Sequence, residues 1–420
     1  MFLLYDLVFL LYALIYLPYL LITRRLYLGF GMRFGLFSPT IKPKIKAKAN
    51  IWVHAVSVGE VMVIDGFIDH LRKSYPAYQI IITVTTKTGY ALAQERLNGK
   101  ALVLPSPIDF SFVAGSFVSL INPKMYIVVE TEIWPNLYRK LYLKKVPIAV
   151  INGRISDTSF GRYKAIRALL KGILAQVSVW CMQSPRDADR IRELGAEASR
   201  VFVTGNVKFD DLPKPLDTSI SDLVSNKEEL WWVAGSTHPG EEDILLDAYD
   251  KVIKDNPHWR LIIVPRHIER AGQVMELVAR HGRKAVKFSE LNKEIRYSEN
   301  AVVVVDTIGQ LRSLYGIASM VFVGKSLCVG GGQNVIEPAY YGKAIVIGPR
   351  VENFRDVVAC FKEGQGIVQV QDAHAFEIAV RELCADDLKR KTLGDAAVAV
   401  ITANQGATRR SLERLAGLLK

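Results

Sequence analysis

Three ionisable side chains in the first half of the chain come shortly after runs of apolar, β-branched residues. These are Glu60, Glu130 and Lys208. An acid that ends a buried strand is costly unless it is paired or used. Glu60 could act as a general base that takes the proton of an acceptor hydroxyl. Gly59 beside it would let a substrate approach closely.

Structural roles compete with these chemical ones. In the stretch SVGE, Ser57 could cap a helix, and Glu60 three residues later completes a capping-box pattern. Glu130 could bond the amides of its own loop, and a lone lysine such as Lys208 is usually solvated. The local sequence leaves both interpretations open for each residue.

The most specific pattern in the second half is VGGGQNVIEPAYYGK, residues 329–343. Three glycines precede a short predicted helix that carries Asn334 and Glu337. Glycines let the backbone approach a phosphate, a helix start favours an anion, and a following acid can bond ribose hydroxyls. This pattern is typical of a nucleotide site.

Three further segments in this half combine a strand end with polar or small residues. They are GSTHPGEE at 235–242, VPRHIER at 264–270 and DTIGQL at 306–311. The first could hold an anion on its backbone amides, and the last places Gly309 near a helix start. Lone arginines and histidines such as those of VPRHIER more often form surface pairs.

Several familiar signatures are missing from the chain. We find no GxGxxG after a first strand, no Walker loop, no HExxH and no GxSxG. The four cysteines are scattered without metal spacing, which indicates reduced core thiols. The acid pair of FDD, 209–211, falls in a predicted linker. We therefore expect no metal and no cofactor.

The elements that must position these residues alternate between strands and helices from residue 51 onward. This alternation predicts an α/β fold with parallel sheets covered by helices on both faces. The polar stretch 206–228 breaks the rhythm and predicts a linker between an N-terminal domain, 51–205, and a C-terminal domain, 229–420. Ligands in such sheets bind at the carboxyl ends of the strands, so we expect a cleft there. The predicted strands are 51–57, 79–85, 101–104, 125–129, 147–151, 177–181, 201–204, 230–235, 260–264, 301–305, 319–323 and 343–347.

The N-terminus differs in composition from the rest. Residues 1–23 are almost wholly apolar, with Asp6 as the single charge, and residues 24–50 carry seven bases and no acid. We interpret 1–23 as a single-pass or monotopic inner-membrane anchor, and 24–50 as a basic segment that contacts anionic lipid on the cytoplasmic side. The alternative is a buried amphipathic helix with a solvated loop. The net charge is +12, and +12 minus +7 leaves only +5 elsewhere, which argues against a nucleic-acid partner.

Six motifs together resemble one family, the Kdo transferases of lipopolysaccharide assembly. They are HAVSVGE, VVETEIWPN, GNVKFD, AGSTHPGEE, VPRHIER and GGQNVIEPAYYGK. The resemblance implies two Rossmann-like domains in the GT-B arrangement. It also implies inverting transfer of Kdo from a CMP-Kdo donor to a lipid A precursor acceptor (lipid IVA) at the inner membrane.

The resemblance also implies roles for particular residues. Glu60 would be the base, and Glu130 and Lys208 would assist the transition state. Helix-dipole stabilisation would lower the pKa of Glu60 and a bound anionic donor would raise it, so the direction stays open. The residues implied in CMP binding are Pro265, Arg266, Ile308, Gly309, Gln310, Asn334, Val335, Ile336 and Glu337.

Other functions remain possible from the sequence. One is a GT-B lipid glycosyltransferase or related epimerase that uses a UDP-sugar. Another is a membrane-anchored protein that binds an anionic lipid without chemistry. A third is a hydrolase that uses Glu60 and Glu130 as its two carboxylates, although the glycine-rich loop would have no purpose there.

Overall fold

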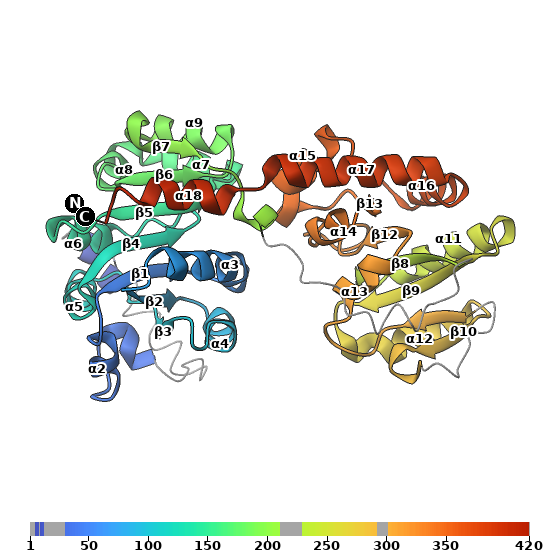
Figure 1. The fold of residues 1–420 in the computed structure, drawn as a ribbon, viewed down its shortest axis with the longest axis horizontal. Coiled ribbons are helices and arrows are strands. Elements are labelled where there is room, and N and C mark those ends of the chain that lie inside the picture. The colour runs from blue at the N-terminus through green and yellow to red at the C-terminus, as the bar shows by residue number, and fades with distance from the viewer. Residues whose placement is uncertain (1–4, 8, 12–29, 211–228, 292–300, 420) are drawn as a thin grey trace. The chain divides into compact units, whose positions relative to one another are not determined.

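The computed structural model describes residues 5–7, 9–11, 30–210, 229–291 and 301–419. The chain divides into two compact units. The N-terminal unit contains Met1–Asp211 together with Gln405–Lys420, and the C-terminal unit contains Leu212–Asn404. Each unit is built on one parallel sheet with helices packed on its faces (Figure 1).

The sheet of the N-terminal unit has seven strands in the order β3-β2-β1-β4-β5-β6-β7. Chain order runs outward from β1 in one direction and from β4 in the other, so the topology reverses between these two neighbours. The strands are β1 (Asn50–Ala55), β2 (Gln79–Val84), β3 (Leu102–Pro105), β4 (Pro123–Val129), β5 (Ile148–Gly153), β6 (Val179–Met182) and β7 (Val201–Val203).

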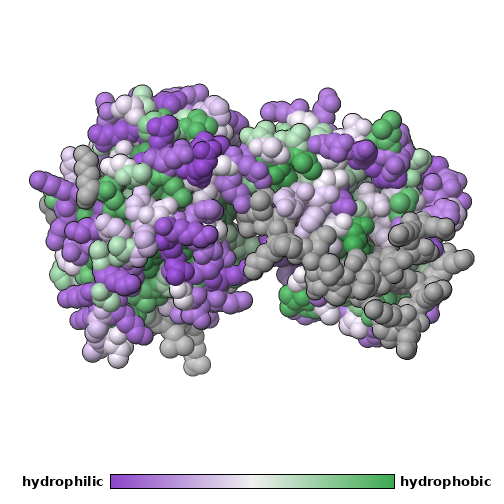
Figure 2. All heavy atoms as spheres, in the orientation of Figure 1, coloured by the Kyte–Doolittle hydropathy of each residue, from purple (hydrophilic) through white to green (hydrophobic). Residues whose placement is uncertain are grey.

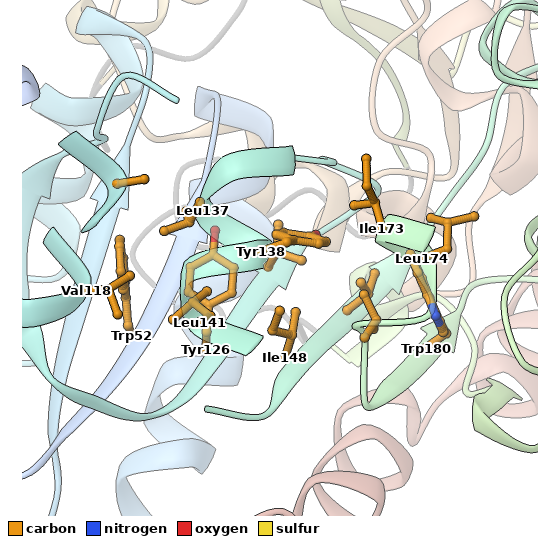
Figure 3. Packing of buried hydrophobic residues seen from close by; sticks show 14 of the residues in the cluster. Trp52, Val118, Tyr126, Leu137, Tyr138, Leu141, Ile148, Ile173, Leu174 and Trp180 are labelled. Carbon is orange, nitrogen blue, oxygen red and sulfur yellow. The ribbon is translucent and has the colours of Figure 1, made fainter. Parts of the chain in front are cut away.

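Alternate residues of these strands point into two separate cores, as expected for a sheet covered on both faces. Trp52, Tyr126 and Trp180 pack on one face, beneath helices that include α6 and α8 (Figure 3). Val53 and Ile127 pack on the other face, against α3. The helices are η1 (Phe30–Phe34), α2 (Ile41–Ile45), α3 (Val58–Ser74), α4 (Lys87–Arg96), α5 (Ser111–Ile121), α6 (Pro135–Leu143), α7 (Asp157–Ala165), α8 (Arg167–Leu174), α9 (Pro185–Leu194), η2 (Ala198–Arg200), η3 (Val207–Asp210) and α18 (Ala407–Leu415).

The C-terminal unit repeats this plan with the strand order β10-β11-β9-β8-β12-β13-β14. Its topology reverses between β8 and β12. The strands are β8 (Leu230–Thr237), β9 (Trp259–Pro265), β10 (Lys284–Lys287), β11 (Ala301–Val304), β12 (Met320–Val323), β13 (Ala344–Ile347) and β14 (Val368–Gln369). The helices are α11 (Glu241–Asp255), η4 (Ile268–Arg270), α12 (Ala271–Arg280), η5 (Phe288–Glu290), α13 (Leu311–Ile317), α14 (Ile336–Tyr340), η6 (Glu352–Phe354), α15 (Arg355–Glu363), α16 (Ala373–Ala385) and α17 (Asp387–Asn404).

The structure confirms the predicted alternation of strands and helices, and twelve of the fourteen strands lie where the sequence places them. The two that the sequence pattern missed, β10 and β14, are both edge strands. β10 carries a lysine at each end, and β14 has only two residues. Short, charged edge strands lack the continuous apolar run of a central strand.

Two predicted domain boundaries are wrong. Residues 405–420 belong to the N-terminal unit, although the sequence placed them in a C-terminal domain 229–420. Their helix α18 buries Ala407 and Leu415 completely in the N-terminal core. Residues 206–210, predicted as linker, belong to the same unit and include η3, where Asp210 accepts hydrogen bonds from the N–H groups of Gly406 and Thr408. The rest of the predicted linker lies outside the described residues.

The predicted basic segment 24–50 is folded against the N-terminal unit as far as it is described. Ile45 of α2 is fully buried, and the Arg33 side chain donates to the backbone oxygen of Ser106 at 3.2 Å. The predicted anchor 1–23 lies largely outside the described residues. In the described part of the chain, no helix combines the length and apolar character needed to cross a bilayer. Hydrophilic residues cover most of the face drawn in Figure 2.

Candidate active site

The topology of the N-terminal sheet brings two of the predicted site residues together. Glu60 lies in the first turn of α3, directly after β1, and Glu130 directly follows β4. β1 and β4 are hydrogen-bonded neighbours at the point where the strand order reverses. Loops that leave such neighbours diverge and open a crevice at the carboxyl ends, where ligands bind in sheets of this kind. The two carboxyl groups therefore lie at the same edge of the sheet, close enough for the charge of Glu130 to raise the pKa of Glu60.

Glu60 is held by the backbone that leads into its helix. Its Oε2 accepts from the N–H of Val56 at 2.5 Å, and its Oε1 accepts from the Ser57 hydroxyl at 3.4 Å. Ser57 is the N-cap, yet its side chain caps no amide, so the reciprocal capping box is not formed. Only 7% of the Glu60 surface is exposed. The carboxylate is thus fixed in position rather than solvated.

The pKa of Glu60 is raised to about 8, chiefly by burial and to a smaller extent by the negative charges of Glu130 and Glu132. The hydrogen bond from Val56 acts in the opposite direction. The direction that the sequence left open is therefore upward, even without a bound donor. A carboxyl group with a pKa near neutrality is well suited to accept a proton in catalysis.

Glu132 belongs to the same site, and the sequence analysis did not single it out. Burial, followed by the charge of Glu130, raises the pKa of the Glu132 carboxyl to about 7. The hydroxyl of Tyr138 donates to its backbone oxygen at 2.7 Å. Its position two residues after Glu130 in ETE was the available signal. In an extended segment, side chains two residues apart point to the same side, so this spacing was itself an indication.

Glu130 itself has a backbone conformation that few residues adopt. Its φ is +57°, in the left-handed region, and its N–H donates to the backbone oxygen of Ile151 at 2.9 Å. Asn152, at the end of the neighbouring β5, has a φ of +53°. Such conformations cost free energy and tend to occur at functional sites.

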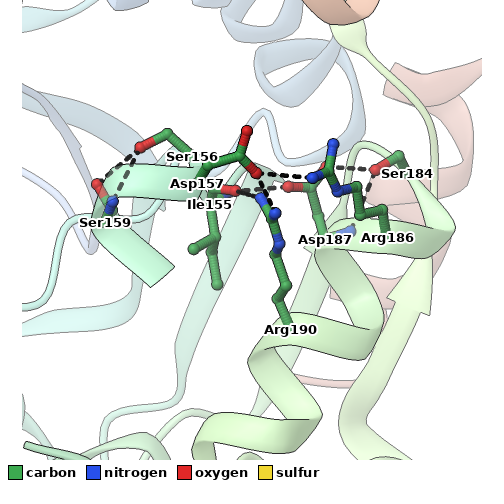
Figure 4. A network of polar contacts seen from close by, with 8 residues as sticks. All are labelled: Ile155, Ser156, Asp157, Ser159, Ser184, Arg186, Asp187 and Arg190. Atoms are coloured by element: carbon green, nitrogen blue, oxygen red, sulfur yellow. Dashed lines mark hydrogen bonds and ion pairs between the residues drawn. The ribbon is translucent and has the colours of Figure 1, made fainter. Parts of the chain in front are cut away.

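A polar network supports the loop behind these acids. The β5–α7 loop donates from the N–H of Arg154 to the Thr131 hydroxyl at 3.0 Å, which connects it to the ETE loop. Asp187 of α9 accepts from the N–H of Ile155 at 2.8 Å, and Arg190 binds both the Ile155 carbonyl and Asp157 (Figure 4). The loop is therefore held by side chains on α9 as well as by its own backbone.

Lys208 lies on η3, which packs against α3, the helix that carries Glu60 at its start. The preceding Val207 donates from its N–H to the Asn152 side chain at 3.0 Å, and the Lys208 N–H donates to Asn206 at 3.0 Å. The carboxyl ends of β5 and β7 are joined in this way. Lys208 thus belongs to the same edge of the N-terminal sheet as the acids.

The predicted nucleotide residues gather at the carboxyl edge of the C-terminal sheet. Pro265 ends β9 and Arg266 follows it, and the segment 308–310 leads from β11 into α13. Arg312 of α13 forms an ion pair with Glu337 of α14 at 3.2 Å between Nε and Oε1. This pair joins the segment 308–310 to the segment 334–337, as the resemblance implies. Ile308 is 85% exposed, which leaves an apolar side chain available to a ligand.

The glycine-rich loop that follows β12 is shaped by two acids. Glu241, fully buried at the start of α11, accepts from the N–H groups of His238, Lys325, Ser326 and Leu327 at 2.8–3.0 Å. The sequence analysis did not single out this residue, although it stands in GSTHPGEE. Its carboxylate gives these buried amides the hydrogen-bond partner that they would otherwise lack.

The second acid is Glu352, which accepts from the N–H of Gly331 at 2.6 Å. The N–H of Gly332 donates to the Lys325 carbonyl at 2.8 Å. Gly331 and Gly332 have φ values of +121° and +68°, so both positions require glycine. The glycines therefore form the loop, but two of their three amides already have partners inside it. The helix that follows, α14, has only five residues.

The comparisons with known proteins agree with this geometry. A family model described as 3-deoxy-D-manno-octulosonic-acid transferase (kdotransferase) matches residues 29–211. A 3-deoxy-D-manno-octulosonic acid transferase of Haemophilus influenzae is 33% identical over 88% of this chain and 86% of its own. One from Bordetella pertussis is 27% identical over 92% of both chains. A UDP-GlcNAc 2-epimerase structure from Neisseria meningitidis shares the fold, with a TM-score of 0.58 and 12% identity over 87% of this chain and 99% of that one.

Two parallel α/β units, one with a buried carboxyl group and the other with a glycine-rich loop at the carboxyl edge of its sheet, fit a glycosyltransferase, which is the class of the Kdo transferase relatives. The similarity to the Haemophilus protein over most of both chains identifies the family within this class. The chain belongs to the family of 3-deoxy-D-manno-octulosonic acid (Kdo) transferases.

Proposed function

We propose that this protein transfers Kdo from CMP-Kdo to a lipid A precursor (lipid IVA), with inversion at the anomeric carbon and with Glu60 as the general base. The observation that carries the proposal is the state of Glu60. Its carboxylate is buried and bonded to the Val56 N–H, and its pKa is raised to about 8. Solvated glutamates are far weaker bases.

In the proposed reaction, an acceptor hydroxyl attacks the anomeric carbon of Kdo. The new C–O bond forms as the bond to the CMP phosphate breaks, and the hydroxyl proton passes to Glu60. The positive charge that develops on the sugar would be stabilised by Glu130, at the same edge of the sheet. Lys208 would stabilise the negative charge on the departing CMP.

The C-terminal unit would hold the cytidine. Glu337 would accept a hydrogen bond from a ribose hydroxyl, with its orientation fixed by Arg312. The exposed Ile308 would pack on the base, next to Gly309 and Gln310. We propose that Pro265, Arg266, Asn334, Val335 and Ile336 complete this site, as the resemblance implies.

The acceptor would be reached at the membrane surface. Lys42, Lys44, Lys46 and Lys48 are all exposed on the N-terminal unit, where they could attract anionic headgroups. Phe112, at the start of α5, is 76% exposed and could enter the lipid interface. We propose that the acceptor's acyl chains stay in the bilayer while its sugar enters the site.

The proposed function is tested by incubating the protein with CMP-Kdo and tetraacylated lipid A precursor, with products resolved by mass. We expect the acceptor mass to increase by whole Kdo units, with one CMP released for each. Transfer from a UDP-sugar under the same conditions, with CMP-Kdo left unused, would overturn the proposal.

A further inference from the structure

Lys325 stands at the position where the C-terminal sheet is most suited to bind a ligand. It follows β12 by two residues, and β12 is hydrogen-bonded to β8 at the point where the strand order reverses. In open parallel sheets, ligands bind in the crevice outside the carboxyl ends at this reversal. No motif considered above gave Lys325 a function.

The backbone of Lys325 is fixed in a conformation that favours glycine. Its φ is +59°, and its N–H and carbonyl are both engaged, with Glu241 at 2.9 Å and with Gly332 at 2.8 Å. A side chain with a Cβ is disfavoured in this region, whereas glycine adopts it freely. The loop thus keeps a strained lysine where glycine would fit without cost, which points to a use for the side chain.

The Lys325 side chain lies along the glycine-rich loop. Its Cε and Nζ are 3.2 and 3.4 Å from the position that a Cβ on Gly331 would occupy. The residue is half-buried, and it forms no ion pair with any residue that the structure describes. The neighbouring carboxylates of Glu241 and Glu352 are already bonded to backbone amides. A half-buried ammonium group therefore remains available at this loop.

Arg266, exposed after β9, is another cation at this edge, but several of the donors around the glycine-rich loop are already engaged. The amides of Gly331 and Gly332 have internal partners, Arg312 is paired with Glu337, and Arg350 donates to the Cys328 carbonyl at 2.6 Å. The helices α13 and α14 have seven and five residues, so their dipoles are small. An anion bound here needs a side-chain cation.

We propose that the Nζ of Lys325 binds the phosphate of the nucleotide held by the C-terminal unit. The ligand class is a nucleoside monophosphate ester, and the inference rests on the proposed function in naming that ester CMP-Kdo. Lys325 would supply the charge that the engaged glycine amides cannot, and it would stabilise the phosphate as the sugar leaves.

The test uses the full-length protein, with CMP and cytidine as probes, in titration calorimetry. Lys325→Gln keeps the length of the side chain but removes its charge. We expect it to raise the Kd for CMP about tenfold or more, as for loss of a charged hydrogen bond, and to leave the Kd for cytidine unchanged. Lys325→Gly should weaken CMP binding equally while it raises the melting temperature, because it removes the left-handed strain.

A second left-handed lysine supplies a matched control. Lys145, exposed at the end of α6 in the N-terminal unit, has a φ of +56°. Lys145→Gly should also raise the melting temperature, but with no change in CMP affinity. A Lys325→Gln protein that binds CMP as tightly as the wild type would overturn the inference. An equal loss for CMP and cytidine would do so too, because Lys325 would then only shape the loop.

Failure of the proposed function gives a different result. The wild type could fail to bind CMP but bind UMP, with Lys325→Gln weakening the binding of UMP. In that case Lys325 binds the phosphate as proposed, and the assignment of CMP-Kdo as the donor is wrong. If Lys325→Gln weakens CMP-Kdo but not CMP, the lysine contacts the sugar carboxylate, and the phosphate assignment is overturned.

Discussion

The Glu60 carboxylate accepts a hydrogen bond from the N–H of Val56, 2.5 Å away, across the junction of β1 and α3. This bond holds the buried carboxyl group in position at the carboxyl edge of the sheet. The same burial raises the pKa of Glu60 to about 8. The hydrogen bond sets the position of the carboxyl group and burial sets its basicity, and both can be tested.

Glu60→Gln should abolish transfer without loss of donor binding. Glutamine keeps the size of the side chain but cannot take the acceptor proton, and loss of a general base typically costs about 10²–10⁴-fold in rate. We expect turnover to fall by that order while the Kd for CMP stays within twofold of the wild type. Near-normal turnover would make Glu130 the preferred base.

The stability of the wild type should depend more strongly on pH than that of Glu60→Gln. The folded-state pKa of Glu60 lies above its ordinary value of 4.5, so the folded state favours the protonated form. Its contribution to the free energy of unfolding is greatest below pH about 4.5 and is lost as the pH rises through about 8. The melting temperature of the wild type should fall more between pH 6 and pH 9 than that of Glu60→Gln. Parallel curves would contradict the raised pKa.

Glu132→Gln should move the pH dependence of the reaction. The base is active when ionised, so kcat/KM should rise with pH and level off above a midpoint near 8. Removing the charge of Glu132 lowers the pKa of Glu60 and should shift this midpoint to lower pH. Glu95→Gln, on the exposed side of α4, serves as the control and should leave the midpoint unchanged. An unmoved midpoint in Glu132→Gln would show that the two carboxylates do not interact.

Glu337→Ala should weaken CMP binding. It removes the proposed ribose contact and the ion pair between Glu337 and Arg312 at 3.2 Å. The expected loss is roughly 1–3 kcal/mol of binding free energy, measured by calorimetry. Glu363→Ala, at the exposed end of α15, is the control for loss of a carboxylate from the same unit. Equal affinities for all three proteins would remove Glu337 from the nucleotide site.

Leu415→Ala should destabilise the N-terminal unit, although the residue lies near the end of the chain. Leu415 is fully buried in that unit's core, and such truncations cost about 2–5 kcal/mol. Denaturant unfolding should show this loss, while CMP binding by the C-terminal unit stays intact. Leu388→Ala, on α17, removes a leucine that is 74% exposed and should change little. Loss of CMP binding in Leu415→Ala would place α18 with the C-terminal domain after all.

Neutralising the basic segment should weaken binding to anionic vesicles. The change replaces Lys42, Lys44, Lys46 and Lys48 by serine, and the effect should be largest at low salt, because exposed charges are screened by ions. Arg33 is left intact, since its side chain is bonded to Ser106 and its loss would test folding instead.

The control protein for this membrane test carries four serine substitutions in the C-terminal unit. It has the same change in net charge and should bind vesicles as tightly as the wild type does. An equal loss of vesicle binding in both variants would mean that the overall charge, and no particular surface, attracts the lipid. The control positions are the exposed lysines Lys254, Lys284, Lys362 and Lys391.

The sequence was sufficient for the features that depend on neighbouring residues. Runs of apolar, β-branched residues predicted the central strands because strands buried on both faces must be continuously apolar. Glu60 and Glu130 could be found because each follows such a strand, and the six motifs identified the family. The strands β10 and β14 were missed because β10 has a lysine at each end and β14 has only two residues, so neither forms a continuous apolar run.

Tertiary structure decided what depends on distant segments. The helix α18 belongs to the N-terminal unit because it is buried there and because Asp210 accepts a hydrogen bond from Gly406. These two residues are almost two hundred positions apart in the chain. The pKa of Glu60 could not be predicted, because burial and the charges of Glu130 and Glu132 act only once β1 and β4 are neighbours. Lys325 gave no signal at all. Its place at the reversal of strand order arises from the pairing of β12 with β8, and its left-handed backbone is held by a hydrogen bond to Glu241, which lies more than eighty residues earlier in the chain.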